Sequence, residues 1–309
     1  MKSINALNTM TRQTSCGGRM TKWKGLTASL AAASLSVSFI ALSAGLAHTQ
    51  TVISTAETTG QTIDTNHDVT LTEAGSIILS GTGPQKAIVI DAIDYNSDVL
   101  LQGTIEVTAS SANDNASAYG IDAPNMGAEG EGGSISNDGT IEVTATVVEG
   151  SATVIGDSGS SSANVYASAY GIYAPVMGAE GSISNDGTIE VTATVEGSAT
   201  ADDANVYAKA YGISASGMGA GGNVSNKGTI IVSADANTVN TLDGVSSLAV
   251  GIDIDTLDGT LINSGTVIAS VANDGDAFAV RVNGGTGQAT FTTASILVGR
   301  LALSLVALT

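Results

Sequence analysis

The stretch Asn137-Asp138-Gly139-Thr140-Ile141-Glu142-Val143-Thr144-Ala145 recurs letter for letter at residues 185–193. Weaker copies follow at 226–234 and around 263–267. A second motif, Ala-Tyr-Gly-Ile or Ala-Val-Gly-Ile, accompanies them and begins at Ala118, Ala169, Ala210 and Ala249. Each copy is too small to bury a hydrophobic core alone, so regular copies of this kind stack on one another. The repeat therefore predicts a solenoid, whose long exposed surface favours a scaffold or binding role over an enzyme.

Within one copy, residues 188–195 alternate apolar and polar side chains at period two, as a half-buried strand does. Shorter strands are expected at 169–174 and 182–184, separated by a turn at 175–181. The glycines of the Gly-Thr step are spaced 36 to 48 residues apart, and the differences in length fall in the loops. The sequence thus predicts an all-β solenoid of degenerate repeats.

The number of coils that one repeat forms stays open at this point. A repeat is either one large coil with a hairpin arm or two ordinary coils. Pairing of residues 188–195 with residues 206–213 as a hairpin slightly favours the first arrangement.

Stacking assigns structural roles to the repeated residues. An asparagine stands at one turn position, where its amide can bond to the next copy, in Asn137, Asn185, Asn226 and Asn263. The isoleucines of the second motif are expected in the core: Ile121, Ile172, Ile213 and Ile252. An apolar stripe is expected from aligning Tyr119, Tyr170 and Tyr211 with Ile88, Val250 and Val280. A platform on which sugars stack is the alternative role of these tyrosines.

Residues 1–47 have the organisation of an export signal. A basic stretch ending at Lys24 precedes an uncharged segment that closes with small residues at Ala47. Signal peptidase requires small residues at this position, so we expect cleavage after Ala47. The alternative is a single membrane anchor, since about 20 apolar residues span a bilayer. Translation from Met20 rather than Met1 would give a signal of more ordinary length.

Charge and cysteine content bound the class of partner. Residues 48–309 keep all 29 acidic residues of the chain but only five of its ten basic ones, a formal charge of −24. Such a surface repels nucleic acid and anionic lipid, which are bound through clustered Lys and Arg. The one cysteine lies within residues 1–47, so disulfides cannot hold an exported form together. Backbone hydrogen bonds along a solenoid can take their place.

Few residues are candidates for chemistry. Three glutamates share one repeat position, Glu106, Glu142 and Glu190, and three aspartates share another, Asp91, Asp122 and Asp253. If a repeat is one coil, the glutamates stack about 4.8 Å apart and repel unless a cation bridges them. They are weak Ca²⁺ candidates, and a solvated face is the plainer interpretation. No catalytic residue and no cofactor is expected.

The alternation of Gly-Ile strands with Ser-Ile-Ser-Asn-Asp-Gly-Thr-Ile turns resembles the passenger domains of autotransporters, exported proteins of Gram-negative outer membranes. The resemblance covers the signal and about 87–293. It implies a right-handed parallel β-helix displayed at the cell surface, with a cell-surface or host glycan or protein as partner. It also implies a C-terminal translocator barrel, for which the apolar tail at 294–309 is too short. The tail is interpreted as the stub of a truncated or frameshifted gene, and a β-helix cap is the alternative.

These observations define the expected organisation and function. Residues 1–47 form the signal, 48–293 the solenoid and 294–309 the tail. The expected function is structural or adhesin-like, without catalysis, at the cell surface or outside the cell, or in the periplasm if the gene is truncated. One alternative is a β-helical enzyme acting on polysaccharides, which would need a residue cluster that breaks the repeat. The other is a truncated product without function. Specific contacts are expected where copies differ, at 150–164 and 200–205.

Overall fold

A computed structural model describes residues 49–63, 67–90, 98–112, 115–126, 132–148, 164–197, 205–238, 244–273, 275–292 and 295–303. The chain divides into two compact units, Met1–Val37 and Ser38–Thr309, and all described residues belong to the second. The expected signal and its cleavage site at Ala47 lie outside the described residues.

The second unit is built from three parallel sheets, which we call A, B and C. Sheet A contains, in spatial order, β1 (Thr49–Ile53), β4 (His67–Leu71), β7 (Asp98–Leu101), β10 (Ser134–Asn137), β14 (Ser182–Asn185), β17 (Asn223–Asn226), β20 (Thr260–Asn263) and β23 (Gln288–Phe291). Sheet B contains β2 (Ala56–Glu57), β5 (Ser76–Thr82), β8 (Thr104–Ser111), β11 (Thr140–Val148), β15 (Thr188–Gly197), β18 (Thr229–Thr238), β21 (Thr266–Val271) and β24 (Ile296–Val298). Sheet C contains β3 (Gln61–Ile63), β6 (Gln85–Ile90), β9 (Ala116–Asp122), β12 (Asn164–Tyr173), β16 (Asn205–Met218), β19 (Val245–Leu257), β22 (Gly275–Val282) and β25 (Arg300–Leu303), with β13 (Val176–Met177) beside β16.

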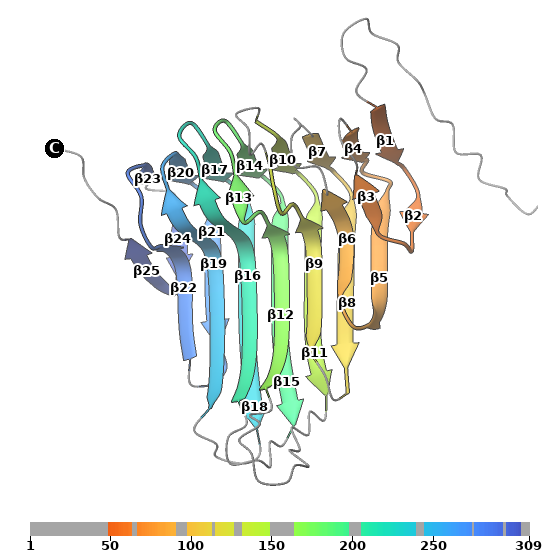
Figure 1. The fold of residues 1–309 in the computed structure, drawn as a ribbon, viewed down its shortest axis with the longest axis vertical. Helices are drawn as coiled ribbons and strands as arrows, with labels where there is room; N and C mark the ends of the chain where they lie inside the picture. The colour runs from red at the N-terminus through yellow and green to blue at the C-terminus, as the bar shows by residue number, and fades with distance from the viewer. Residues whose placement is uncertain are drawn as a thin grey trace, which may run out of the picture. The chain divides into compact units, whose positions relative to one another are not determined.

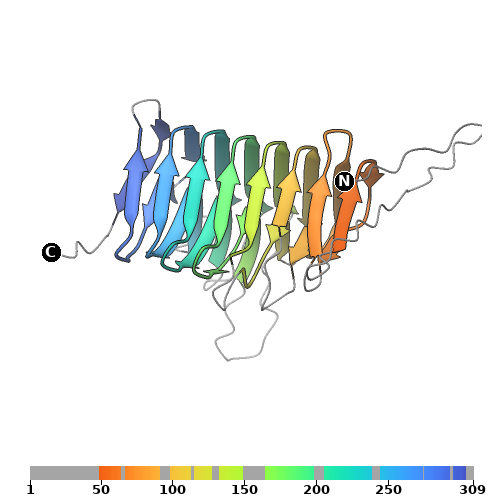
Figure 2. The same ribbon diagram turned by 90° about the horizontal axis from the view of Figure 1, so that it is seen from above.

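The chain visits the sheets in the order A, B, C and then returns to A, so three consecutive strands make one coil of a parallel β-helix (Figure 1). The described residues form eight such coils, which we number in chain order, and Figure 2 shows them stacked in sequence along one axis. The expected fold class is confirmed. One repeat is one coil, because residues 140–148 pair in register with residues 188–196.

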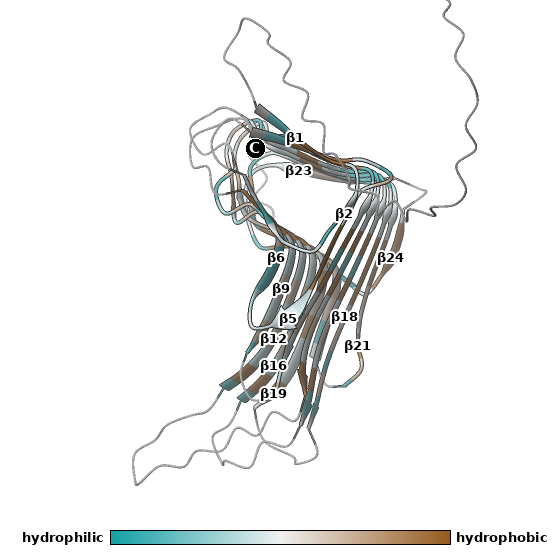
Figure 3. Ribbon diagram, turned by 90° about the vertical axis from the view of Figure 1, so that its right-hand side faces the viewer, coloured by the Kyte–Doolittle hydropathy of each residue, from teal (hydrophilic) through white to brown (hydrophobic). Residues whose placement is uncertain are grey.

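The prediction of a hairpin within one repeat is wrong. Strand β15 hydrogen-bonds to β11 and β18 of the neighbouring coils, and β16 bonds to β12 and β19. Sheets B and C instead pack face to face, with sheet A across one end of the cross-section (Figure 3). Long B and C strands are therefore held by side-chain packing across the core, because each pairs only within its own sheet.

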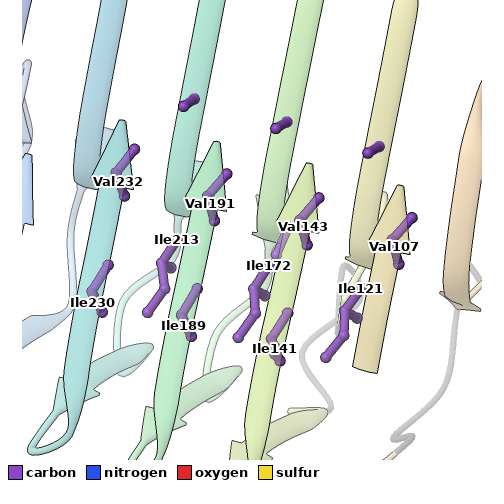
Figure 4. Packing of buried hydrophobic residues seen from close by; sticks show 14 of the residues in the cluster. Val107, Ile121, Ile141, Val143, Ile172, Ile189, Val191, Ile213, Ile230 and Val232 are labelled. Atoms are coloured by element: carbon purple, nitrogen blue, oxygen red, sulfur yellow. The ribbon is translucent and has the colours of Figure 1, made fainter. Parts of the chain in front are cut away.

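The core lies between the sheets and repeats from coil to coil. Isoleucines of sheet C face isoleucines and valines of sheet B, and all of them are buried (Figure 4). The expected core positions Ile121, Ile172, Ile213 and Ile252 are each 0% exposed, which confirms them. The alternation expected along β15 is also present, since Ile189, Val191 and Ala193 are buried and Glu190 is exposed.

Three boundaries differ from the sequence-based expectation. The strand expected at 169–174 begins earlier, at Asn164, because residues 164–168 pair with residues 205–209. The turn expected at 175–181 contains β13, which pairs with Gly217 and Met218. The solenoid also runs beyond residue 293, since β24 and β25 pair with β21 and β22 and extend the stack to Leu303.

Candidate functional site

The outer face of sheet C gathers the aromatic and basic side chains of the second unit. Six of the seven tyrosines in the chain lie on β9, β12 and β16: Tyr119, Tyr166, Tyr170, Tyr173, Tyr207 and Tyr211. All six are half-buried and alternate with buried residues, so they point away from the core. Four of the five basic residues after residue 47 share this sheet: Lys86, Lys209, Arg281 and Arg300. We call this surface the tyrosine face.

One column of the tyrosine face is a continuous aromatic stack. The ring centroids of Tyr119 and Tyr170 lie 4.9 Å apart and those of Tyr170 and Tyr211 lie 5.0 Å apart, with interplanar angles of 5°. The parallel register places the three rings at coil spacing, about 4.8 Å, which is also the spacing of stacked rings. Because each ring covers its neighbour's face, the column offers a ligand ring edges and hydroxyl groups rather than ring faces.

The sequence aligned this column incorrectly at both ends. The neighbour of Tyr119 is Lys86, and the neighbour beyond Val250 is Phe278. Ile88 and Val280, which were expected in the column, instead pair with the core isoleucines of the second motif. The expected apolar stripe is therefore an aromatic column with a cation at its end: the Lys86 Nζ atom lies 5.2 Å from the Tyr119 ring centroid.

Two ion pairs flank the column. The Arg281 guanidinium donates two hydrogen bonds to the Asp253 carboxylate, from Nε to Oδ1 at 2.7 Å and from Nη2 to Oδ2 at 2.8 Å. Lys86 pairs with Asp122. Asp122 and Asp253 are 5% and 7% exposed, so each carboxylate is removed from water and compensated by a cation of an adjacent coil. The position expected to hold Asp91 is occupied by Val89, which pairs with Asp122.

Burial and charge suppress ionisation of the stacked tyrosines. Desolvation raises the pKa values of Tyr119, Tyr170 and Tyr211, and nearby negative charge raises them further. At Tyr211 the charge and hydrogen bond of Arg281 act in the opposite direction. All three hydroxyls therefore remain protonated at neutral pH, when they can donate as well as accept a hydrogen bond.

A second pair of tyrosines surrounds Lys209. The rings of Tyr166 and Tyr207 stack with centroids 4.9 Å apart. The Lys209 Nζ atom lies 5.7 Å and 5.4 Å from these two centroids. Lys209 forms no ion pair with any residue that the structure describes. Its charge, two aromatic rings and neighbouring hydroxyls make this the part of the face best suited to an acidic or hydroxyl-rich partner.

The glutamates proposed as weak calcium ligands stack as one column on the outer face of sheet B. Glu142 pairs in register with Glu106 on one side and Glu190 on the other, and all three are exposed. The column ends at Ile78 and Ile231. Across the described residues, no group of three or more His, Cys, Asp or Glu side chains is arranged to hold a metal ion.

The asparagine ladder is confirmed and buried. The Nδ2 atom of each asparagine donates to Oδ1 of the next at 2.7 Å, through Asn137, Asn185, Asn226 and Asn263, and all four are 0% exposed. The last one donates to the Gly265 carbonyl at 3.3 Å. The first has an unpaired Oδ1 atom, because its neighbour in the preceding coil is Leu101. These asparagines stabilise the stack and are closed to a ligand.

The sequence did not predict the basic residues of the tyrosine face. Lys86, Lys209 and Arg281 each occur in one copy only, so the repeat pattern gives no signal for them. Of the segments expected to hold specific contacts, only Asn164 and Asn205 are described, and Asn205 donates to Asn164 at 2.9 Å. The remaining residues of 150–164 and 200–205 lie outside the described part.

None of the described segments is a helix with the length and apolar character of a membrane crossing. Comparisons with family models, with curated proteins and with solved structures found no match to this chain.

Proposed function

We propose that the chain is an exported, non-enzymatic β-helical protein with a structural or adhesive role at the cell surface, and that the tyrosine face is its adhesive surface. The observation that carries the proposal is the concentration on sheet C of six tyrosines and of four of the five basic residues after residue 47. Tyrosine and arginine side chains are enriched at protein interfaces, and tyrosine combines an apolar ring with a polar hydroxyl. The rest of the surface is acidic and repels most polyanions.

A non-enzymatic role agrees with how the carboxylates are used. Asp122 and Asp253 are engaged with Lys86 and Arg281 and lie three coils apart, about 14 Å. Glycoside hydrolysis requires two free carboxyl groups within about 5–9.5 Å of each other on either side of a bound sugar. The exposed glutamates of sheet B meet the distance, but they lie on one flat strand face instead of flanking a substrate.

Export and adhesion are tested separately. For export, the full chain is expressed in a Gram-negative host, and the N-terminal residue of the protein recovered from the periplasm, cell surface and medium is determined. We expect His48 at the N-terminus outside the cytoplasm. An intact N-terminus in the cytoplasm would contradict export.

For adhesion, binding of the exported protein to cells and to an array of immobilised glycans is compared between the wild type and Lys209→Ala. The matched control is Lys227→Ala, which removes an exposed lysine paired with Asp186 on another part of the surface. We expect at least a tenfold loss for Lys209→Ala and little change for the control. Equal binding by both variants would reject the tyrosine face, and release of reducing ends from the glycans would support the enzyme alternative.

A further inference from the structure

The two ends of the coil stack differ in the chemistry that they present. In coil 1, Ile63 pairs with the buried Ile90 of coil 2, and four further positions carry Thr51, Ile53, Glu57 and Gln61, which pair with the buried Val69, Leu71, Ile77 and Ile88. Three of these four side chains are polar. A polar terminal coil covers the core of a solenoid and keeps that end soluble.

The last coil lacks such a cover among the described residues. Its inward-facing positions carry Ala289, Phe291, Leu297, Leu301 and Leu303, which pair with buried residues of coil 7. Leu301 and Leu303 occupy core columns behind Val280 and Val282, yet they are 49% and 42% exposed. Ile296 and Val298 add outward apolar surface at 56% and 49% exposed. Among the described residues, the hydrophobic core is therefore uncovered at this end, which we call the C-terminal end face.

Strands β23, β24 and β25 are the last members of their sheets, so each has one edge that no strand of the described residues pairs with. Free edges of parallel sheets bind further strands unless charge, proline or a covering segment blocks them. Apart from Arg300, no charged residue lies on these three strands.

Charge indicates which partner fits. Residues 277–309 contain Arg281 and Arg300 but no Asp or Glu, in a chain whose residues 48–309 carry a formal charge of −24. Strands β23, β24 and β25 carry no carboxylate, so two C-terminal end faces approach each other without repulsion between acidic residues on these strands. Stacking of the C-terminal end face on coil 1 of another copy would instead bury the Glu57 carboxylate against leucine, at a high desolvation cost.

We propose that the C-terminal end face binds the same face of a second copy, so that two solenoids join tail to tail. The interface is isologous, which means that the same residues of both copies meet and that association stops at a dimer. Each copy covers the leucines and free edges of the other. The proposal does not rest on an adhesive role of the tyrosine face, from which this interface includes Arg300 of β25.

The first test measures mass. The full chain, carrying Cys16→Ser, is expressed and the purified protein is examined by sedimentation velocity over a range of concentrations. We expect a dimer for the wild type, and weakening of dimerisation by roughly 100-fold or more in Leu301→Glu, because two carboxylates would be buried unpaired. The matched control is Val52→Glu at the opposite end, a residue that is 55% exposed. It should leave the dimer unchanged, and circular dichroism confirms that both variants fold.

The second test determines which ends of the two solenoids meet. Residues 48–309 contain no cysteine, so a single cysteine reports on its own neighbourhood. Thr292→Cys, which lies at the exposed end of β23, should form disulfide-linked dimers, and Ser54→Cys at the other end should not. A monomeric wild type would overturn the proposal, and so would open filaments. A monomer that dimerises only after removal of residues 304–309 would assign the cover to the chain's own tail and would also overturn it.

Discussion

Gly171 on sheet C lies directly opposite Ile189 on sheet B, and a Cβ atom at Gly171 would stand 2.5 Å from the Cγ2 atom of Ile189. The same opposition recurs in the neighbouring coils, between Gly120 and Ile141 and between Gly212 and Ile230. Gly171 and Ile172 are both buried, so the in–out alternation of the strand is broken here. The glycine of the second motif is thus favoured by the close packing of the two sheets and by the Gly212 carbonyl oxygen, which would lie 2.6 Å from the same Cβ atom.

Gly171→Ala is expected to destabilise the fold by about 1–3 kcal/mol, because overpacking forces the facing strands apart. The cost stays moderate since alanine occupies this column at both ends of the stack, at Ala87 and Ala279. Chemical denaturation measures the free energy of unfolding. The control is Gly217→Ala, where the nearest atom to an added Cβ is the Pro175 carbonyl oxygen at 3.8 Å, so a loss as large as that of Gly171→Ala would contradict the explanation.

The asparagine ladder predicts an effect that depends on position. Asn185→Leu removes two side-chain hydrogen bonds, to Asn137 and Asn226, and leaves the Asn226 Oδ1 atom buried without a donor. We expect a loss of about 2–4 kcal/mol in unfolding free energy. Asn137→Leu removes one ladder bond and leaves the Asn185 Oδ1 atom without its donor, but it also removes an Oδ1 atom that is already unpaired, and it continues the column of Leu71 and Leu101. Its cost should be no more than half as large, and equal costs would reject the ladder as a source of stability.

The stacked tyrosines predict loss of stability in alkali. An unfolded tyrosine ionises with a pKa of about 10, whereas burial raises the pKa of Tyr170 in the folded chain. Above pH 10 the unfolded state therefore loses protons that the folded state keeps, so unfolding becomes more favourable as pH rises. This contribution is fully present below pH 10.

Thermal unfolding from pH 8 to pH 11.5 measures this effect in the wild type and in Tyr170→Phe, which keeps the ring and removes the hydroxyl. Tyr170→Phe should lose stability less steeply above pH 10 and run parallel to the wild type below pH 9. Identical slopes above pH 10 would show that the folded Tyr170 ionises like an unfolded tyrosine.

The glutamate column predicts a stabilising substitution. Glu142 has a like charge on each side, so Glu142→Gln should raise the unfolding free energy by about 0.5–1 kcal/mol at low salt. Glu106→Gln should gain about half as much, because its other neighbour is Ile78. Both gains should shrink in 0.5 M salt. If millimolar Ca²⁺ raises the melting temperature of the wild type but not of Glu142→Gln, the column binds calcium. If it raises neither, the column is a solvated row of like charges.

The repeat predicted the solenoid and the columns whose residues recur in it. Asn185 and Ile172 were assigned correctly because they occupy the same place in several coils, so one alignment locates them all. Coil 2 was harder to recognise, although Gly75-Ser76-Ile77 corresponds to the Gly-Thr-Ile step. Its residues keep the apolar–polar alternation of the motif and side chains of similar size, but their identities differ.

The candidate site was largely hidden from the sequence. Lys86 reached the Tyr119 column only through a register that a letter alignment displaced by two residues. Arg281 and Asp253 lie 28 residues apart and meet because one coil of the chain separates them. Such a contact depends on the length of each coil, which varies with its loops. The pairing partners of β15 and β16 were equally ambiguous. Alternation of apolar and polar residues identifies a strand, but it does not show whether the strand pairs with the next strand in the chain or with the equivalent strand of the neighbouring coil.

Residues 137–145 and 185–193 are identical in sequence and pair with each other in register. The number of coils in the stack can therefore change by a single genetic event. Where the DNA encoding the two stretches is also similar, unequal recombination between them would insert or delete one whole coil. Because the two stretches occupy the same columns, every ladder would close again across the junction. Each event would change the rod by about 4.8 Å and leave both ends and the cross-section as they were.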